Sequence, residues 1–306
     1  MNGIIRSCPI CGASPHRAPL FVEDTLDASR LSNASFASRK EPEYMSRRMV
    51  QCPRCDLVYV PTPPTAADLA AAYHSADYDS AEEADDAAAT YMRETAVLIG
   101  GLRGRQRALE IGTGTGAFLQ CLHNAGFAEV VGVEPSLAAI AAAPAERRAW
   151  IRGGVFDQSD FVAESFDLIC CFMTLEHVLD PMALATAAWR LLRPNGALIT
   201  VTHDYRSFIN RVLGRRSPII DIEHQQIFSQ RSIVQLFGRT GFERISARPF
   251  ANTYAVRYWW RLMPLPPTAK RMLGRITDRS RLGRMRLSLR VGNTISIGFK
   301  PEQQGV

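Results

Sequence analysis

Short apolar runs and longer amphipathic stretches alternate along the chain from residue 108 to residue 240. The apolar runs have the length and the Val, Ile and Leu content of buried parallel strands, and the stretches between them repeat apolar residues at helical spacing. The predicted strands cover 108–111, 129–134, 149–152, 166–172 and 197–202, and the predicted helices cover 116–125, 136–143, 180–192 and 229–240. This alternation predicts an α/β fold built on a doubly wound parallel sheet.

Two further strands are predicted after these elements, at 241–248 and 293–300, and an insertion of about forty residues (253–292) separates them. The insertion is rich in Arg, Leu, Met and Trp, and its pattern is partly helical and amphipathic. Three interpretations remain open: a helix pair packed on the domain surface, a lid or wall of a substrate pocket, and a patch that meets a membrane surface or another polyanion.

The first strand and the first helix are joined by a loop with three alternating glycines. Gly112, Gly114 and Gly116 lack the Cβ atoms that would hold a ligand away from the backbone, and the following helix begins with unpaired N–H groups. The next strand delivers Glu134 to its carboxyl end, where a carboxylate can accept both hydroxyls of a ribose. NAD and S-adenosylmethionine both carry that ribose, so these residues alone do not choose between them.

The order of the motifs resembles that of the class I S-adenosylmethionine-dependent methyltransferases. Residues 110–116 (Glu-Ile-Gly-Thr-Gly-Thr-Gly) are similar to their first motif, and Glu134 occupies their acidic second-strand position. Residues 165–169, 175–181 and 191–198 resemble their fourth strand, the segment after it and the turn into the fifth strand. The resemblance covers about residues 90–250 and the closing strand.

This resemblance implies a Rossmann-like, mostly parallel seven-stranded sheet with an antiparallel last strand, and S-adenosylmethionine as the cofactor. The cofactor-binding residues that it implies are Glu110, Gly112, Thr113, Gly114, Gly116, Glu134, Pro135 and Asp157. Asp157 lies two positions beyond the place where many relatives carry an adenine-binding Asp, so a solvated loop carboxylate is the alternative interpretation.

Four of the seven cysteines form two Cys-x-x-Cys pairs near the N-terminus, at Cys8, Cys11, Cys52 and Cys55. Two such knuckles supply the four ligands of a tetrahedral zinc site, and four thiolates leave no open position for a reacting water. A structural zinc ribbon is therefore predicted, with reduced, unoccupied turns as the alternative. The other cysteines lie in apolar surroundings and are assigned to the core: Cys121, Cys170 and Cys171.

The chain divides into a zinc-ribbon module (1–60), a linker with a helical lead-in (61–105) and a methyltransferase domain (106–306). Prolines at 61–65 mark the linker, and helices are predicted at 66–73 and 82–102. A zinc ribbon followed by paired tyrosines resembles the N-terminal module of bacterial methyltransferases found with sugar and polysaccharide biosynthesis. That resemblance implies a carbohydrate-linked acceptor.

Charge is concentrated in one segment of this 306-residue chain, whose net charge is +6. Residues 254–292 hold ten basic side chains against the single acid Asp278. The first residues lack the apolar core of a signal peptide, and no apolar run has the length of a membrane span, about 18 residues. A cytoplasmic protein is predicted, peripheral to the inner membrane surface if the basic segment meets lipid, and its oligomeric state stays open.

Methyl transfer requires an aligned nucleophile and often a base that takes its proton. His177 and His203 follow the fourth and fifth strands, whose ends border the ligand crevice, and His224 lies in a segment that borders the acceptor pocket in the resembled family. Glu176 is a candidate for orienting a base, binding an acceptor hydroxyl or contributing to a divalent metal site. The alternative for His177 is a packing or helix-capping role, and the alternative for Glu176 is a carboxylate placed near a helix N-terminus.

The predicted function is transfer of a methyl group from S-adenosylmethionine to a small or carbohydrate-linked acceptor, at oxygen before carbon or nitrogen. One alternative is an RNA methyltransferase whose basic segment follows a phosphate backbone. Nucleic acid is the less favoured partner, because the aromatic residues cluster at 258–260 instead of being interleaved for base stacking. A non-catalytic platform is the second alternative, and the intact glycine loop argues against it.

Overall fold

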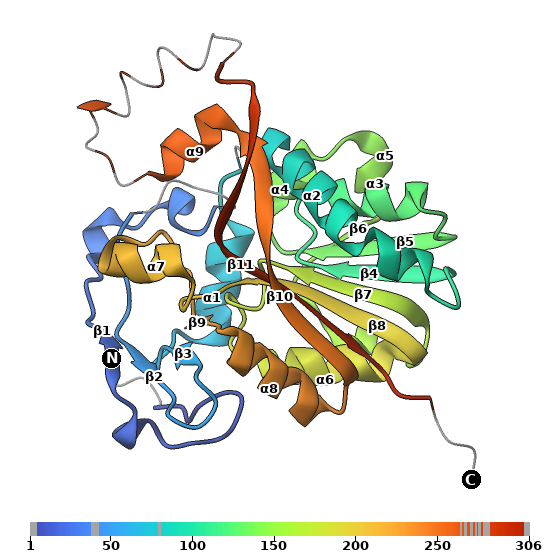
Figure 1. Ribbon diagram of the computed structural model, residues 1–306, viewed down its shortest axis with the longest axis horizontal. Coiled ribbons are helices and arrows are strands. Elements are labelled where there is room, and N and C mark those ends of the chain that lie inside the picture. Colours follow the sequence, from blue (N-terminus) through green and yellow to red (C-terminus); the bar gives the residue numbers. More distant parts are fainter. Residues whose placement is uncertain are drawn as a thin grey trace.

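The computed structural model describes residues 5–37, 43–78, 81–263, 265, 268–269, 272, 274, 277 and 282–302. Its main sheet has seven strands (Figure 1), in the spatial order β10 (Glu243–Ala255), β11 (Arg286–Phe299), β8 (Leu192–His203), β7 (Phe166–Phe172), β4 (Arg107–Ile111), β5 (Glu129–Glu134) and β6 (Ile151–Gly153). The last strand, β11, is antiparallel to both of its neighbours, and the remaining pairs are parallel. The predicted fold class is confirmed.

Helices cover both faces of this sheet (Figure 1). One face carries α2 (Ala81–Gly100), α3 (Ala117–Asn124), α4 (Leu137–Ala142) and α5 (Ala145–Arg148), and the other carries α6 (Pro181–Leu191) and α8 (Gln230–Thr240). Each face has its own apolar core, around Phe118 and Leu122 on the first and around Leu184 and Phe237 on the second. The parallel strands are buried on both sides, which explains their near-continuous apolar sequence.

Helix α8 begins and ends where its sequence predicts. The hydroxyl of Ser229 accepts a hydrogen bond from the backbone N–H of Ser232, and the hydroxyl of Ser232 accepts one from the backbone N–H of Ser229. These two bonds form a capping box. The helix ends at Gly241, whose φ of 97° is in the left-handed region that glycine tolerates. The helix predicted at 229–240 is confirmed.

Strands β10 and β11 run farther than the sequence predicted. Their antiparallel pairing extends from Glu243 opposite Phe299 to Ala255 opposite Arg286, so both ends of the expected insertion belong to the sheet. Between the strands, α9 covers Val256–Leu262. Five of the basic residues that marked the insertion lie outside the described residues: Lys270, Arg271, Arg275, Arg279 and Arg281.

Several arginines of this region pair with acids at the start of α2. Arg286 lies 2.8 Å from Asp86, and Arg257 forms an ion pair with Glu82. The intervening helix α9 contributes Trp259 to the wall of a large cavity. The ion pairs fit an element packed on the domain surface and Trp259 fits a pocket wall, so for the described part of the insertion both interpretations stay open. No described helix combines the length and the apolar character needed to cross a membrane.

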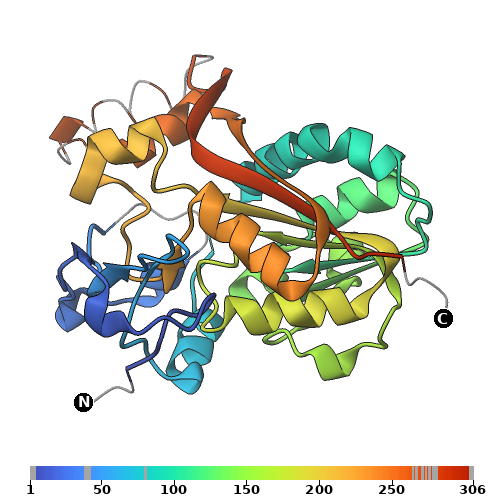
Figure 2. The ribbon, with the colours of Figure 1, turned by 60° about the horizontal axis from the view of Figure 1, so that its bottom comes forward.

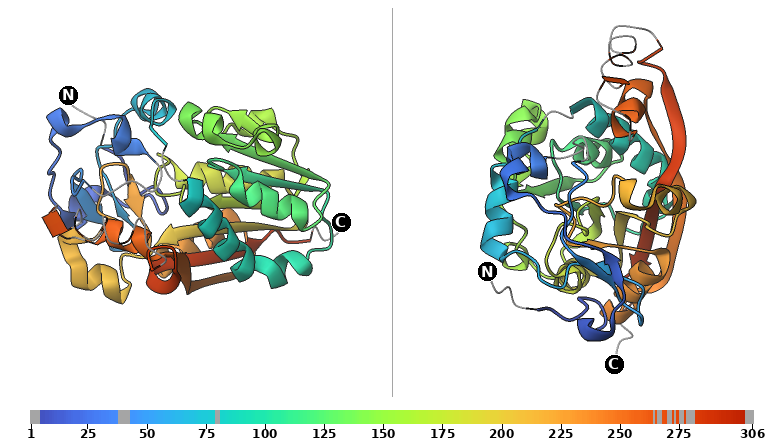
Figure 3. Two further views of the ribbon diagram at one scale, coloured as in Figure 1. Left: turned by 90° about the horizontal axis from the view of Figure 1, so that it is seen from above. Right: turned by 90° about the vertical axis from the view of Figure 1, so that its left-hand side faces the viewer.

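The N-terminal module, residues 5–60, has a sheet of four strands that includes a segment from far along the chain. The order is β1 (Leu20–Val22), β2 (Met49–Gln51), β3 (Val58–Tyr59) and β9 (Gln226–Ile227). Figure 3 shows this module (blue) at the opposite end of the molecule from the last described residues. It therefore stands at the carboxyl ends of the parallel strands, where ligands bind in such sheets.

Two further helices lie near the module. Helix α1 (Ala66–His74) follows the proline linker, and α7 (Phe208–Leu213) follows β8. Figure 2 shows α7 at the same end of the molecule as the module. The short 3₁₀ turns cover Pro15–Arg17, Ala28–Arg30, Asn33–Phe36, Gln158–Asp160 and Gly214–Arg216. Helix α7 and strand β9 were not predicted from the sequence.

Candidate active site

A cavity of about 1250 Å³ opens at the carboxyl ends of the central strands. Its wall includes Gly114 and Glu134 at one end and His177, His203 and His224 at the other. Pockets for one drug-sized ligand commonly enclose about 300–1,000 Å³. The cavity therefore has room for a nucleoside cofactor together with a second substrate.

The glycine loop contributes to this cavity in two different ways. Gly112 has a φ of 76°, and a Cβ at this position would overlap the side chain of Thr174, so the glycine allows the loop to pack on β7 and the residues after it. Gly114 has a φ of 57°, and a Cβ there would meet no atom within 4 Å. Gly114 thus leaves open space along the cavity, which is the space a ligand would fill.

Glu134 lies at the end of β5, where its carboxylate accepts the backbone N–H of Gly114 at 2.7 Å and that of Ser136 at 2.9 Å. Burial raises the pKa of Glu134, and the two N–H bonds offset this effect only in part. Each carboxylate oxygen holds one of these bonds and can accept another. The carboxylate is therefore placed to bind a pair of hydroxyl groups.

The other predicted cofactor residues surround this pair. Those that line the cavity are Glu110, Gly112, Thr113, Pro135 and Asp157. The hydroxyl of Thr113 donates to the carboxylate of Glu110 at 2.5 Å, which links the end of β4 to the loop. Gly116 is not part of the cavity wall; it has a φ of 70° and starts helix α3.

Asp157 lies at the exposed rim of the cavity. One carboxylate oxygen accepts both the backbone N–H and the hydroxyl of Ser159 at 2.8 Å, and these bonds lower the pKa of Asp157. Its second oxygen holds neither of these bonds. Contact of Asp157 with an adenine stays a prediction.

Three histidines from separate segments meet at the far end of the cavity. The ring of His224 lies 4.9 Å from that of His177 and 5.3 Å from that of His203, measured between ring centroids. His177 follows β7, His203 ends β8 and His224 precedes β9. The structure therefore brings together the three histidines that the sequence nominated.

The tautomer of His224 follows from its hydrogen bond. Its Nδ1 lies 2.8 Å from the carbonyl oxygen of Ile219, and since a carbonyl can only accept, Nδ1 carries the proton. Burial, with a smaller contribution from the neighbouring His177, lowers the pKa of His224 to about 4. The imidazole is therefore neutral at pH 7, and its Nε2 has a lone pair available to take a proton.

Two residues that the sequence did not nominate support His177. Its Nδ1 lies 2.8 Å from the hydroxyl of Tyr73 and 3.7 Å from the carboxylate of Glu223. Burial raises the pKa of Tyr73 well above its usual range, so its hydroxyl stays protonated. Tyr73 precedes His177 by 104 residues, and only the folded chain brings them together. Glu223 could have been noticed as the immediate neighbour of His224.

Glu176 is fully buried and lies behind His203 instead of on the cavity wall. Its carboxylate accepts the backbone N–H of His203 at 2.6 Å and lies 3.4 Å from Nδ1 of the same residue. Burial raises the pKa of Glu176, but these interactions with His203 outweigh that effect and lower it. These contacts are the ones expected if Glu176 orients the candidate base His203, and a direct contact of Glu176 with an acceptor or a metal stays a prediction.

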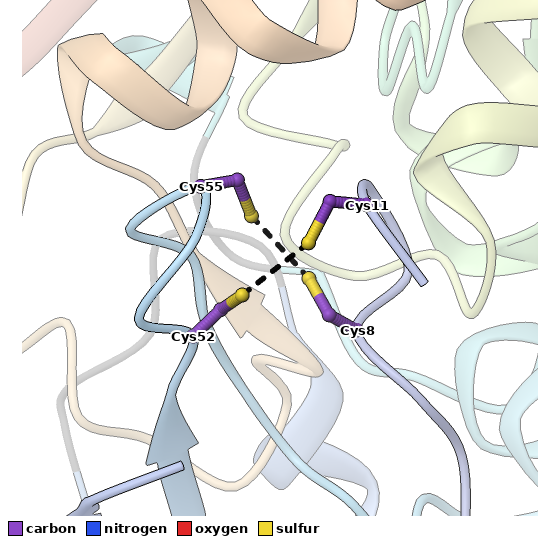
Figure 4. A group of neighbouring side chains, drawn as sticks. All are labelled: Cys8, Cys11, Cys52 and Cys55. Carbon is purple, nitrogen blue, oxygen red and sulfur yellow. Dashed lines mark hydrogen bonds between the residues drawn. The ribbon is translucent and has the colours of Figure 1, made fainter. Parts of the chain in front are cut away.

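The four paired cysteines converge on one point between two loops (Figure 4). The Sγ atoms of Cys8 and Cys55 are 3.3 Å apart, and those of Cys11 and Cys52 are 3.4 Å apart. A second group with donor atoms within 4.8 Å of one another consists of His177, Glu223 and His224. The predicted clustering of the N-terminal cysteines is confirmed. As predicted, Cys170 and Cys171 are buried in the core, and Cys121 is half-buried.

Comparisons with known proteins agree with this architecture. A family profile described as a methyltransferase domain matches residues 82–247, more than half of the 306 residues. The chain belongs to this methyltransferase-domain family. A ubiquinone biosynthesis O-methyltransferase from Alkalilimnicola ehrlichii is 33% identical to this chain over 127 aligned residues. The alignment covers 39% of this chain and 51% of the relative. The chain thus spans about half the length of the curated relatives it matches.

Solved structures that align with this chain share little sequence with it. A SAM-dependent methyltransferase from Archaeoglobus fulgidus aligns with a TM-score of 0.48 at 16% identity, covering 70% of this chain and 94% of that chain. A phosphoethanolamine N-methyltransferase from Haemonchus contortus, in complex with S-adenosyl-L-methionine, aligns with a TM-score of 0.44 at 17% identity, covering 70% of this chain and 52% of that chain.

Proposed function

We propose that this chain transfers a methyl group from S-adenosylmethionine to a hydroxyl oxygen of a small acceptor. The observation that carries the proposal is the shared cavity, which has Gly114 and Glu134 at one end and the histidine cluster at the other. The curated relatives are named as O-methyltransferases, which supports oxygen as the methylated atom.

Gly114 and Glu134, at what we call the cofactor end of the cavity, suit the nucleoside part of S-adenosylmethionine. The carboxylate of Glu134 would accept the ribose hydroxyls, and the open space beside Gly114 would admit the ligand close to the backbone. When bound, S-adenosylmethionine supplies a methyl group on a positively charged sulfur that leaves as a neutral thioether.

The three histidines, at what we call the acceptor end of the cavity, suit deprotonation of the acceptor. Nε2 of His224 would take the hydroxyl proton, while the carbonyl of Ile219 keeps the imidazole in the required tautomer. Tyr73 and Glu223 fix the ring of His177. The ring of His177, held in this way, would orient the acceptor hydroxyl beside His224. Placement of the reacting groups would contribute as much as the base itself.

We infer that the acceptor is carbohydrate-linked, or similarly rich in hydroxyl groups. Asn252 and Asn293 are 1% and 7% exposed and line the cavity. Both polar atoms of the Asn252 amide, and the amide oxygen of Asn293, have no hydrogen-bond partner among the described residues. Buried amides of this kind are nearly always hydrogen-bonded, so these side chains make part of the cavity wall polar, and this polarity supports an acceptor with several hydroxyl groups.

We also propose that the four N-terminal cysteines hold a structural zinc ion. Four thiol groups that converge from two loops are the donor set of such a site. Metal analysis of the purified chain should give one zinc ion per chain. Cys52→Ser should reduce this content, whereas Cys121→Ser, a matched change in the main domain, should not. Equal zinc content in both variants would reject the assignment.

Calorimetric titration of S-adenosylmethionine and S-adenosylhomocysteine tests the cofactor. Glu134→Ala should weaken binding, whereas Glu129→Ala, a matched change at the exposed start of the same strand, should not. NAD serves as the competing ligand, and preferential binding of NAD would overturn the proposal. An acceptor screen follows, with nucleotide sugars and phenolic compounds compared and the methylated atom identified by mass spectrometry and NMR.

A further inference from the structure

The N-terminal module holds the segment that carries His224. In the module's sheet, Val58 of β3 pairs with Ile227 and Tyr59 pairs with Gln226, two residues after His224. The ladder continues with a hydrogen bond of 3.0 Å from the N–H of residue 60 to the carbonyl of residue 225. The backbone that presents His224 is therefore fixed by the strand that follows the second cysteine knuckle.

Arg6 makes a second connection from the module, beside the first knuckle. Its guanidinium donates to the carbonyl oxygen of Gln225 at 2.7 Å and to that of Leu179 at 2.5 Å. These two carbonyls belong to the segments that carry His224 and His177. Arg6 precedes the ligand Cys8 by two residues, so the path from the cysteine cluster to both histidine segments is short.

Asp56 makes a third connection, directly after Cys55. Its buried carboxylate accepts two hydrogen bonds of 2.5 Å from the guanidinium of Arg206 and one of 2.8 Å from the hydroxyl of Ser229. Its backbone carbonyl accepts the hydroxyl of Tyr205 at 3.1 Å. Residues 205–206 follow His203, and Ser229 caps the helix after β9. Asp56 itself has a φ of 69°, a left-handed conformation that its surroundings must maintain.

We propose that the four-cysteine module positions the acceptor end of the cavity, with Asp56 and Arg6 as positioning residues for His203 and His224. A metal ion bound by both knuckles would fix the loop that carries Asp56, and loss of the ion would release it. The proposal rests on the function proposed above. The cofactor end has its own supports, because Glu134 bonds to Gly114 and Ser136 in its own neighbourhood.

Hydrogen exchange on the full-length protein tests the proposal without an activity assay. Zinc is removed with a thiol-reactive mercurial and a chelator, and peptides are compared before and after removal. Peptides covering 203–206 and 223–229 should lose protection, whereas those covering 110–116 and 129–136 should not. Unchanged exchange at 203–206 and 223–229 would overturn the proposal, and so would an equal loss in all four regions.

Variants of Asp56 test the same point with the metal in place. Asp56→Ala should lower kcat by about 10- to 100-fold, the scale expected for misplaced reacting groups, with zinc content and S-adenosylmethionine affinity unchanged. Asp56→Asn keeps an acceptor oxygen and should restore part of the rate. Asp24→Ala, a matched change at an exposed site of the same module, should have no effect.

An unchanged kcat in Asp56→Ala, or equal rates in the Ala and Asn variants, would overturn the positioning role. Failure of the proposed function looks different, because the unmodified protein would then neither bind S-adenosylmethionine nor methylate any acceptor. The hydrogen-exchange pattern would still decide whether the module controls the histidine segments.

Discussion

The two ends of the cavity are built in opposite ways. At the cofactor end, the backbone N–H of Gly114 donates to the carboxylate of Glu134, and these two residues are only 20 positions apart in the sequence. At the acceptor end, Tyr73 reaches His177 across 104 residues, and Arg6 reaches Gln225 across 219 residues. The hydrogen bonds of Glu134 at the cofactor end lie within two consecutive strands, β4 and β5, and the segment between and directly after them, whereas the acceptor end depends on contacts between segments far apart in the sequence.

This difference gives the two ends different sensitivities. A local unit keeps its geometry as long as its own strand and helix are packed, and β4 and β5 lie inside the main sheet. The acceptor end also requires the N-terminal module, because β3 and Asp56 hold the segments that carry its histidines. Mutations can therefore separate the two ends, and the following predictions run from the largest expected effect to the smallest.

His224→Ala should have the largest effect on turnover. Loss of a general base lowers kcat by about 10²- to 10⁴-fold. The affinity for S-adenosylmethionine should stay the same, because Glu134 and Gly114 lie at the other end of the cavity. Steady-state kinetics and calorimetry measure the two quantities. His123→Gln, at an exposed histidine of α3, is the control, and a parallel loss of cofactor affinity in His224→Ala would show that the ends are not independent.

Gly114→Leu should weaken the binding of the cofactor, the quantity that His224→Ala leaves unchanged. The new side chain would extend from a position where a Cβ meets no atom within 4 Å, so it would fill the proposed cofactor space and not clash with the protein. Cofactor affinity should fall by about 100-fold or more, while the left-handed backbone adds a cost of about 1–2 kcal/mol in stability.

Gly112→Ala is the matched comparison within the same loop. Its Cβ would overlap Thr174, so we expect a lower free energy of unfolding, by about 1–3 kcal/mol as in other overpacked sites. Calorimetry and thermal unfolding separate the two outcomes. If Gly114→Leu bound S-adenosylmethionine normally, the position of the ligand in the cavity would have to be revised.

His224 at the acceptor end should contribute to the pH dependence of stability, and Glu134, whose pKa is raised by burial, contributes with the opposite sign. The pKa of His224 is about 4 in the folded protein against 6.5 as its ordinary value, so between these values the unfolded chain binds more protons and stability falls as pH falls. From pH 7 to pH 5 the loss is at most about 2 kcal/mol. Glu176, whose pKa is lowered from 4.5, contributes only at lower pH.

Thermal unfolding of the wild type and of His224→Gln across this range checks the sign and the source. The variant should lose less of its Tm between pH 7 and pH 5 than the wild type loses. Identical curves would mean that another group causes the dependence. A larger loss of Tm in the variant than in the wild type would contradict the buried, neutral state of His224.

The same contrast explains which features the sequence could predict. The glycine loop, Glu134 and the strand order follow from contiguous motifs and from the strict alternation of strands and helices. Strand β9 could not be found in this way, because it is only two residues long and exists as a strand by pairing with β3. Long-range pairing also extends β10 and β11 into the insertion, where the basic composition suggested a separate surface element.

Among the candidate site residues, His177 and His203 were nominated because they follow predicted strands, and His224 because it lies in a segment that borders the acceptor pocket in the resembled family. Tyr73 was not, because nothing in helix α1 distinguishes its hydroxyl from that of any other tyrosine before the contact with His177 is known. For Glu176 the sequence left three roles open, because its position beside His177 does not show that its side chain turns toward His203.

Tyr73→Phe should have the smallest of these effects, and it probes the acceptor end most selectively. The ring of Tyr73 also packs on Phe36, with centroids 5.4 Å apart, so phenylalanine keeps the packing and removes only the hydroxyl on His177. Loss of one such hydrogen bond costs about 0.5–1.5 kcal/mol, or up to about tenfold in rate. The loss should fall on kcat or on the KM for the acceptor and leave cofactor affinity unchanged. If Tyr73→Phe lowered the affinity for S-adenosylmethionine instead, Tyr73 would belong to the cofactor end, and the contrast between the two ends would not hold.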